Sequence, residues 1–233
     1  MAKVFIGVGH GGNDPGACGN SLKESELNLR QALALKSVLE RHNIDVKLSR
    51  YKEENDDLSE EIRECNAYSP DLALDMHTNS GGGTGFEVFH SIAAGSKGKT
   101  LAYNINVEVK DAGLISRGCK TKVNSYGTDY FGFIRQTSCP AIITEMAFID
   151  NWNDIKNFDE DYEIKKYATC VAKGILKTLN ITYKEEVVTP PASTGDVFYR
   201  VVVASFKDKA NAIEKQEELK KAGFDSFLVA FTQ

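Results

Sequence analysis

The sequence predicts an α/β protein whose main domain contains a mostly parallel sheet with helices on both faces. Short apolar runs, typical of buried strands, alternate along the chain with longer segments in which apolar residues recur at helical spacing. Strands that alternate with helices in this way indicate a mostly parallel sheet covered on both sides. A change of composition after residue 181 indicates a linker followed by a small second unit.

The N-terminal part of the chain is predicted to form a strand, a helix and a second strand. Val4 to Val8 is short, rich in β-branched residues and followed by glycines, which indicates a buried strand that ends in a loop. Apolar residues fall near helical spacing from about Ser25 to Arg41, and Ile44 to Leu48 supplies the next strand. These elements make a βαβ unit.

The alternation continues through the rest of the main domain. A helix over Leu58 to Tyr68, with Ser59 as its N-cap, is ended by Pro70. The polar and aromatic segment 116–133 is expected to line a cleft. Three further strands and two further helices are predicted, the strands over residues 72–76, 86–90 and 141–145 and the helices over residues 101–112 and 164–179.

The chain is expected to divide into a main domain over residues 1–181, a linker over 182–195 and a C-terminal unit over 196–233. The linker contains two adjacent prolines and little to bury. The C-terminal unit is predicted to be a βαβ unit, with a helix over Lys207 to Ala222 and Gly223 as its C-cap, between strands over residues 198–206 and 227–231. A unit of this size buries too small a core to be stable by itself.

Composition excludes several classes of protein. The formal net charge of -5 argues against a nucleic-acid partner, because such proteins carry basic patches that neutralise phosphates. No apolar stretch approaches the roughly 18 to 20 residues of a membrane span. The N-terminus breaks into glycines too early for the core of a signal peptide, so we expect a protein made in the cytoplasm.

Four polar residues follow or end predicted elements where α/β proteins bind ligands, beyond the carboxyl ends of the strands. His10 follows the first strand, Glu24 begins the first helix, and His77 and Glu145 end two later strands. Two imidazoles and one carboxylate form a usual ligand set for catalytic zinc. Taken singly, a histidine at a strand end is also a common structural residue, and a glutamate at a helix start also complements the helix dipole.

The segment GVGHGGNDPGACGNSLKESELNLRQALAL resembles the opening motif of the zinc-dependent N-acetylmuramoyl-L-alanine amidases. The resemblance covers about residues 2 to 180, and it implies that His10, Glu24 and His77, the last within HTN, bind Zn²⁺. It also implies that Glu145, within ITEMAFIDN, is the catalytic base. The chain departs from the motif at Val8 and Gly9, where relatives often have Asp-Pro, and this affects the local turn.

Two assignments near these residues leave alternatives. Glu24 and Glu26 both belong to the LKESELN segment, and their side chains point about 200° apart on a helix, so only one can face a metal. The motif favours Glu24. Asn79, two residues beyond His77, is expected to hold substrate or to orient a ligand, against a simple role in a turn.

The C-terminal segment FYRVVVASFKDKANAIEKQEELKKAGFDSFLV is similar to one repeat of the sporulation-related peptidoglycan-binding domain, which usually contains two such repeats in one sheet. A single repeat exposes sheet edges and half a core. Pairing with the same unit of a second chain covers both, so we expect a homodimer through residues 196–233.

The resemblances imply an enzyme that cleaves the amide bond between N-acetylmuramic acid and L-alanine in bacterial peptidoglycan. Two alternatives are a zinc carboxypeptidase or endopeptidase acting on the peptides of peptidoglycan, and a wall-binding protein with no catalytic activity. An amidase with a wall-binding unit and no signal peptide is typical of a phage endolysin or a mother-cell sporulation hydrolase, which acts on the wall after release.

Overall fold

The structure is a computed structural model that describes residues 1–93, 95–156, 158, 161–186, 202, 204–206, 208–224 and 226–229. The chain forms two compact units, Met1–Glu185 and Glu186–Gln233. Among the described residues, no helix combines the length and the apolar character that crossing a bilayer requires.

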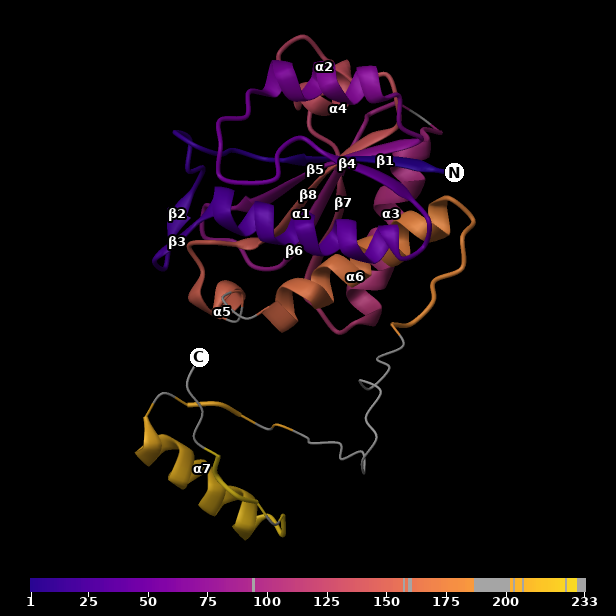
Figure 1. The fold of residues 1–233 in the computed structure, drawn as a ribbon. Coiled ribbons are helices and arrows are strands. Elements are labelled where there is room, and N and C mark those ends of the chain that lie inside the picture. The colour runs from indigo at the N-terminus through magenta and orange to yellow at the C-terminus, as the bar shows by residue number, and fades with distance from the viewer. Residues whose placement is uncertain are drawn as a thin grey trace. The chain divides into compact units, whose positions relative to one another are not determined.

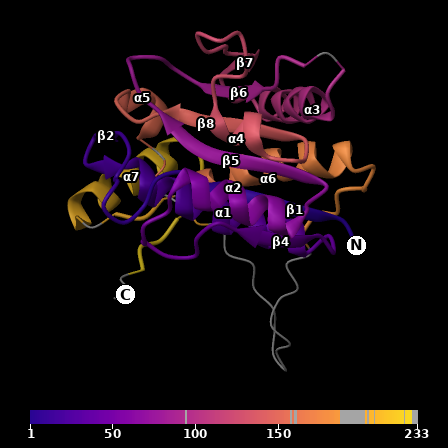
Figure 2. The same ribbon diagram turned by 90° about the horizontal axis from the view of Figure 1, so that it is seen from above.

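The first unit is built on a six-stranded sheet with the strand order β4-β1-β5-β8-β6-β7, which Figure 2 shows from one face. Four neighbouring strands, β4, β1, β5 and β8, run parallel, whereas β6 is antiparallel to β8, and β7 runs parallel to β6. The strands are β1 Lys3–Val8, β4 Asp45–Leu48, β5 Leu72–Asn79, β6 Phe86–His90, β7 Ser116–Lys120 and β8 Ala141–Phe148. A small hairpin, β2 Cys18–Gly19 with β3 Leu22–Lys23, precedes the first helix.

Helices cover both faces of this sheet, which confirms the predicted fold class (Figure 1). α1, α3 and α6 lie on one face over the larger core, and α2 and α4 lie on the other over a smaller cluster that includes Phe5, Ile62 and Phe133. The helices of this unit are α1 Glu24–Glu40, α2 Leu58–Tyr68, α3 Lys97–Asp111, α4 Gly132–Gln136, α5 Trp152–Ile155 and α6 Asp161–Thr178.

Several boundaries differ from the predicted ones for local reasons. Asp57, and not Ser59, caps α2, because its side chain accepts the hydrogen bond from the Ser59 backbone N–H. The segment 116–133, expected only to line a cleft, contributes the edge strand β7 and the start of α4. Its strand was missed because SRGCK lacks the apolar pattern by which buried strands are recognised.

Arg50 is a fully buried cation that joins three parts of the first unit. Its guanidinium donates to the carbonyl oxygens of Val8 at 3.1 Å, Ser25 at 2.7 Å and Lys52 at 3.2 Å. It therefore connects the end of β1, which directly precedes His10, to the first turn of α1, which carries Glu24.

Replacing Arg50 with methionine is expected to lower the free energy of unfolding by roughly 3 to 5 kcal/mol, because buried carbonyls lose their donors. Chemical denaturation followed by circular dichroism measures this change. Arg63→Met is the matched control, since Arg63 lies exposed on α2 and pairs with Glu60 at the surface. A loss in Arg50→Met no larger than that of the control would contradict a structural role for Arg50.

The second unit contains one described helix, α7 Lys209–Lys221, close to the predicted bounds. Asp208 caps its N-terminus, and Gly223, just past its end, has a φ of +86° that favours glycine. Most of the predicted strand over 198–206 and the end of the strand over 227–231 lie outside the described residues. Residues 204–206 and 226–229 are described and are not in a strand.

Candidate active site

The parallel strands of the sheet bring three of the predicted residues to one edge. His10 follows β1, and His77 and Glu145 lie directly opposite one another on β5 and β8. Side chains alternate along a strand, so His77 shares its face of the sheet with Asp75, and Glu145 shares it with Ile143. This is the face that α2 and α4 cover.

His10, Glu24 and His77 converge closely enough to hold one metal ion. Each offers one ligand atom, and these three atoms all lie within 4.8 Å of one another. The shared centre of the group is Oε1 of Glu24, which lies 3.4 Å from Nε2 of His10 and 2.9 Å from Nδ1 of His77. The structure thus brings together the three residues that the sequence suggested as ligands.

Glu24 occupies the first turn of α1 with its carboxylate buried and fixed from several sides. Its Oε2 accepts a hydrogen bond from the Ala17 backbone N–H at 2.9 Å, and Oε1 accepts one from the Thr78 N–H at 3.1 Å. Burial alone would raise the pKa of this carboxyl, but the hydrogen bonds with His10 and His77 hold it well below its usual value. Glu26, by contrast, is exposed and pairs with Lys23 at 2.8 Å.

A carboxylate orients each of the two imidazoles. Nδ1 of His10 lies 2.8 Å from Asp14 Oδ2, and Nε2 of His77 lies 3.1 Å from Asp75 Oδ2. The hydrogen bond with Glu24 raises the pKa of His10. Burial acts to lower the pKa of His77, but the charge of Asp75 and its hydrogen bond outweigh it and leave that pKa well above the usual value. Each ring thereby turns its other nitrogen toward Glu24.

The backbone around the site is shaped to let these side chains approach. His10 has a φ of +65°, a conformation uncommon for residues other than glycine. A Cβ on Gly9 would lie 2.3 Å from the His77 ring, and one on Gly16 would lie 2.7 Å from both Glu24 Oε2 and the His10 ring. The glycines of the GHGG and DPGA segments therefore make room for the three ligand side chains.

Glu145 lies beside this group in an environment suited to proton transfer. Burial raises its pKa to about 7, with the charge of His77 opposing the rise and nearby carboxylates adding to it. A carboxyl with a pKa near neutrality can both accept and return a proton at physiological pH. The other strand that flanks β8 places Glu87 opposite Glu145.

Asn79 lies at the end of β5, where its amide contacts protein groups. Its Nδ2 donates to Glu87 Oε2 at 3.3 Å, and its Oδ1 accepts from the Ser80 N–H at 2.8 Å. Glu87 also pairs with Arg117 and Lys120. Asn79 is thus linked to a charged cluster next to Glu145. Among the described residues, no hydrogen bond joins its side chain to His10, Glu24 or His77.

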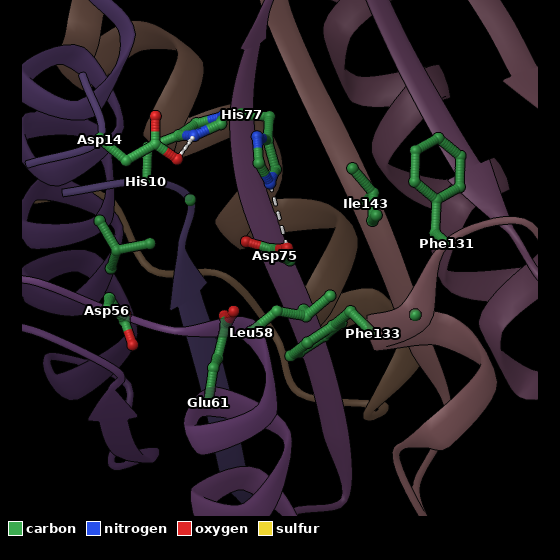
Figure 3. Close-up of a pocket in the computed structure, with 13 residues that line it drawn as sticks. His10, Asp14, Asp56, Leu58, Glu61, Asp75, His77, Phe131, Phe133 and Ile143 are labelled. Carbon is green, nitrogen blue, oxygen red and sulfur yellow. Dashed lines mark hydrogen bonds and ion pairs between the residues drawn. The ribbon is translucent and has the colours of Figure 1, made fainter. Parts of the chain in front are cut away.

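A cavity of about 280 Å³ opens beside the two histidines and extends between α2 and α4 (Figure 3). Asp56, Glu61 and Asp75 line it on one side, and Leu58 and Phe133 are among its apolar lining residues. Of the segment 116–133, Phe131, Gly132 and Phe133 reach this cavity.

Sequence reasoning missed the carboxylates that support the site. Asp14 follows His10 by four residues within GHGGND, and Asp75 precedes His77 by two residues on the same strand face. The alternation of a strand could have indicated Asp75, because residues two apart share a face. Glu61 carried no such signal, since it arrives from a different element, α2.

Comparison with known proteins identifies both parts of the chain. The N-acetylmuramoyl-L-alanine amidase family profile matches residues 4–177, and the SPOR domain profile matches residues 172–230. A sporulation-specific N-acetylmuramoyl-L-alanine amidase of Bacillus subtilis is 34% identical over 98% of this chain and 85% of its own length. An endolysin of Bacillus phage SPP1 is 33% identical over 78% of this chain and 67% of its own length.

Solved structures agree with the sequence matches. The catalytic domain of CwlV, an N-acetylmuramoyl-L-alanine amidase from Bacillus (Paenibacillus) polymyxa var. colistinus, superposes with a TM-score of 0.70 at 26% identity, over 78% of this chain and all of that domain. The match to the amidase profile spans all of the six-stranded sheet except its first residue, and it includes His10, Glu24, His77 and Glu145. The chain therefore belongs to the N-acetylmuramoyl-L-alanine amidase family, and it carries a SPOR domain after its enzymatic one.

Proposed function

We propose that this amidase hydrolyses the bond between N-acetylmuramic acid and L-alanine with His10, Glu24 and His77 as zinc ligands and Glu145 as general base. The observation that carries the proposal is the convergence of three ligand atoms within 4.8 Å, on the sheet edge that also holds Glu145. The carboxyl of Glu145, with its raised pKa, is the group best placed to move a proton.

The donor set fits zinc by its chemistry and by its surroundings. Two imidazoles and one carboxylate leave a fourth position open for catalysis. Asp14 and Asp75 fix the orientation of the two rings, an arrangement that metal-binding histidines commonly have. Gly9 and Gly16 leave the space that the ligands need. When bound, zinc supplies a Lewis acid that activates water and polarises the amide carbonyl.

The residues of the chain divide the remaining work. Glu145 takes a proton from the attacking water and returns it to the nitrogen of the departing alanine, which is otherwise a poor leaving group. Its burial keeps the carboxyl near the pKa at which both transfers are feasible. The Ala17 and Thr78 N–H groups hold the Glu24 carboxylate in place throughout.

The reaction can be tested by digesting purified peptidoglycan with the zinc-loaded protein and analysing the products by mass spectrometry. Stem peptides that begin with a free alanine amino group are expected, and chelation should abolish their release. Cleavage between peptide residues would instead show a carboxypeptidase or endopeptidase, and unchanged peptidoglycan would leave a wall-binding protein without activity.

We also propose that the SPOR unit delivers the enzyme to the wall after release from the cell that makes it. Both a sporulation amidase and a phage endolysin are similar to this chain, which supports either setting. The described part of the SPOR unit leaves apolar side chains exposed, among them Val202 at 67%, Phe224 at 63% and Phe227 at 71%. No residue of α7 is buried.

These exposed side chains support a homodimer through residues 196–233, because a second copy of the unit would cover them. Light scattering at micromolar concentration is expected to give twice the monomer mass of 25.7 kDa. Phe227→Asp should shift the protein to the monomer, whereas Tyr126→Asp, at an exposed aromatic of the amidase unit, should not. A strict monomer for the unmodified chain would reject the dimer.

A further inference from the structure

The cavity beside the two histidines has an acidic wall with unsatisfied oxygens. Glu61 and Asp75 line it and are 5% and 2% exposed, and among the described residues Glu61 Oε1 and Asp75 Oδ1 have no hydrogen-bond partner. Asp56, which also lines the cavity, has a third such oxygen, Oδ2. Buried carboxylate oxygens without partners are costly, so this wall is built to meet a donor that enters from outside.

The carboxylates of Glu61 and Asp75 in this wall are close enough to share one donor. A Cβ on Gly7 of β1 would lie 1.7 Å from Glu61 Oε1 and 2.9 Å from Asp75 Oδ1, so both oxygens crowd the same point above the strand. Figure 3 shows Glu61 reaching from α2 toward Asp75. Burial raises the pKa of Glu61 well above its usual value, with the charge of Asp75 as the next cause. A cation between the two would relieve this repulsion.

The size and lining of the cavity decide which cation fits. Among the described residues, only His10, Glu24 and His77 bring three metal-ligand atoms within 4.8 Å of one another, so the three acids of the wall do not form a second cluster of this kind. None of the thirteen described residues that line the cavity is Lys or Arg; the positive charges that reach the wall are those of His77, paired with Asp75 through the other carboxylate oxygen, and of Arg50, which is not among the lining residues. Leu58, Phe133 and Ile143 add apolar lining to the same cavity, and Ile143 lies next to Asp75 in the sheet.

An ammonium group on a short aliphatic chain matches this arrangement. Its N–H donors can meet the carboxylates of Glu61 and Asp75, with the charge of Asp56 nearby, while its methylene groups pack against the apolar lining residues. The stem peptide of peptidoglycan carries such a group on the side chain of its diamino acid, on the leaving side of the scissile bond. We propose that this cavity is a substrate subsite that binds the side-chain ammonium of that diamino acid. This inference rests on the proposed function of the neighbouring site.

The experiment compares two substrates on the zinc-loaded full chain, a muramyl tripeptide that ends in lysine and its counterpart in which the lysine Nε is acetylated. Acetylation removes the charge and two donors, so kcat/KM is expected to fall by at least about tenfold. Glu61→Gln should bring the ratio of the two kcat/KM values close to one. Glu60→Gln, at an exposed neighbour on α2, should leave the ratio as it is.

A second measurement separates this subsite from the reaction. Calorimetric titration with the product peptide L-Ala-D-Glu-L-Lys and with its acetylated form measures binding without turnover, and the free amine is expected to bind more tightly. Equal kcat/KM for both substrates, with hydrolysis intact, would overturn the subsite and leave the amidase reaction standing. If neither substrate is hydrolysed, the proposed function fails, and the titration still decides the subsite: equal affinities overturn it.

Discussion

Replacing Glu145 with glutamine is expected to lower kcat by roughly 10²- to 10⁴-fold, the usual contribution of a general acid–base group. Glutamine keeps nearly the same shape on β8 but cannot take a proton from water or return one to the leaving nitrogen. Burial raises the pKa of Glu145 to about 7, which suits this carboxyl to accept and return a proton near neutral pH. The side-chain amide of glutamine does not titrate in this range. Initial rates on a soluble muramyl peptide measure the effect.

Zinc content decides how that loss is interpreted. Glu145 is not among the three residues whose ligand atoms converge, so the variant is expected to retain zinc at the level of the unmodified protein. Glu40→Gln, at an exposed position near the end of α1, provides a control for the chemistry of the substitution. Full activity in Glu145→Gln would remove Glu145 from the mechanism, and loss of zinc together with activity would make it a metal-holding residue.

The sequence predicted those features of the protein that a local pattern records. The buried strands β1, β5 and β8 are apolar runs, and the polar residues that end or follow them are visible as breaks in those runs. Strand direction leaves no such record, so the antiparallel course of β6 and the edge strand β7 could not be predicted. An edge strand needs fewer apolar residues, because one side of it has no neighbour.

The site was predicted only in part for a similar reason. Motif resemblance indicated the three candidate ligands and the base but not the carboxylates around them: Asp14 and Asp75 are near the histidines in sequence, whereas the approach of Glu61 depends on long-range packing. Glu61 on α2 approaches Asp75 only because Gly7 of β1, which lies opposite Asp75 in the sheet, has no side chain at that point. Arg50 secures the His10 loop through backbone carbonyls, and hydrogen bonds to the backbone leave no signature in the identity of the partner residue.

Glu24 and Glu26 provide a matched pair that tests which carboxylate holds the metal. Both lie in the first turn of α1, but Glu24 is buried between His10 and His77, and Glu26 is exposed beside Lys23. Glu24→Gln is expected to weaken zinc binding by more than about 100-fold, the upper end of the loss typical for residues that only support a ligand. The glutamine side chain has no negative charge. It has one acceptor oxygen, whereas the carboxylate of Glu24 has two, which accept from the Ala17 and Thr78 N–H groups.

Glu26→Gln is expected to leave zinc affinity within about twofold, since Glu26 is exposed, pairs with Lys23 and is not among the three residues whose ligand atoms converge. Competition titration with a chromophoric chelator gives both affinities, and circular dichroism confirms that each variant is folded. The opposite result, with zinc lost in Glu26→Gln and kept in Glu24→Gln, would require the first turn of α1 to be rotated by about half a turn from its position here, because the two side chains point about 200° apart. The pair therefore tests the ligand assignment and the orientation of the helix in one experiment.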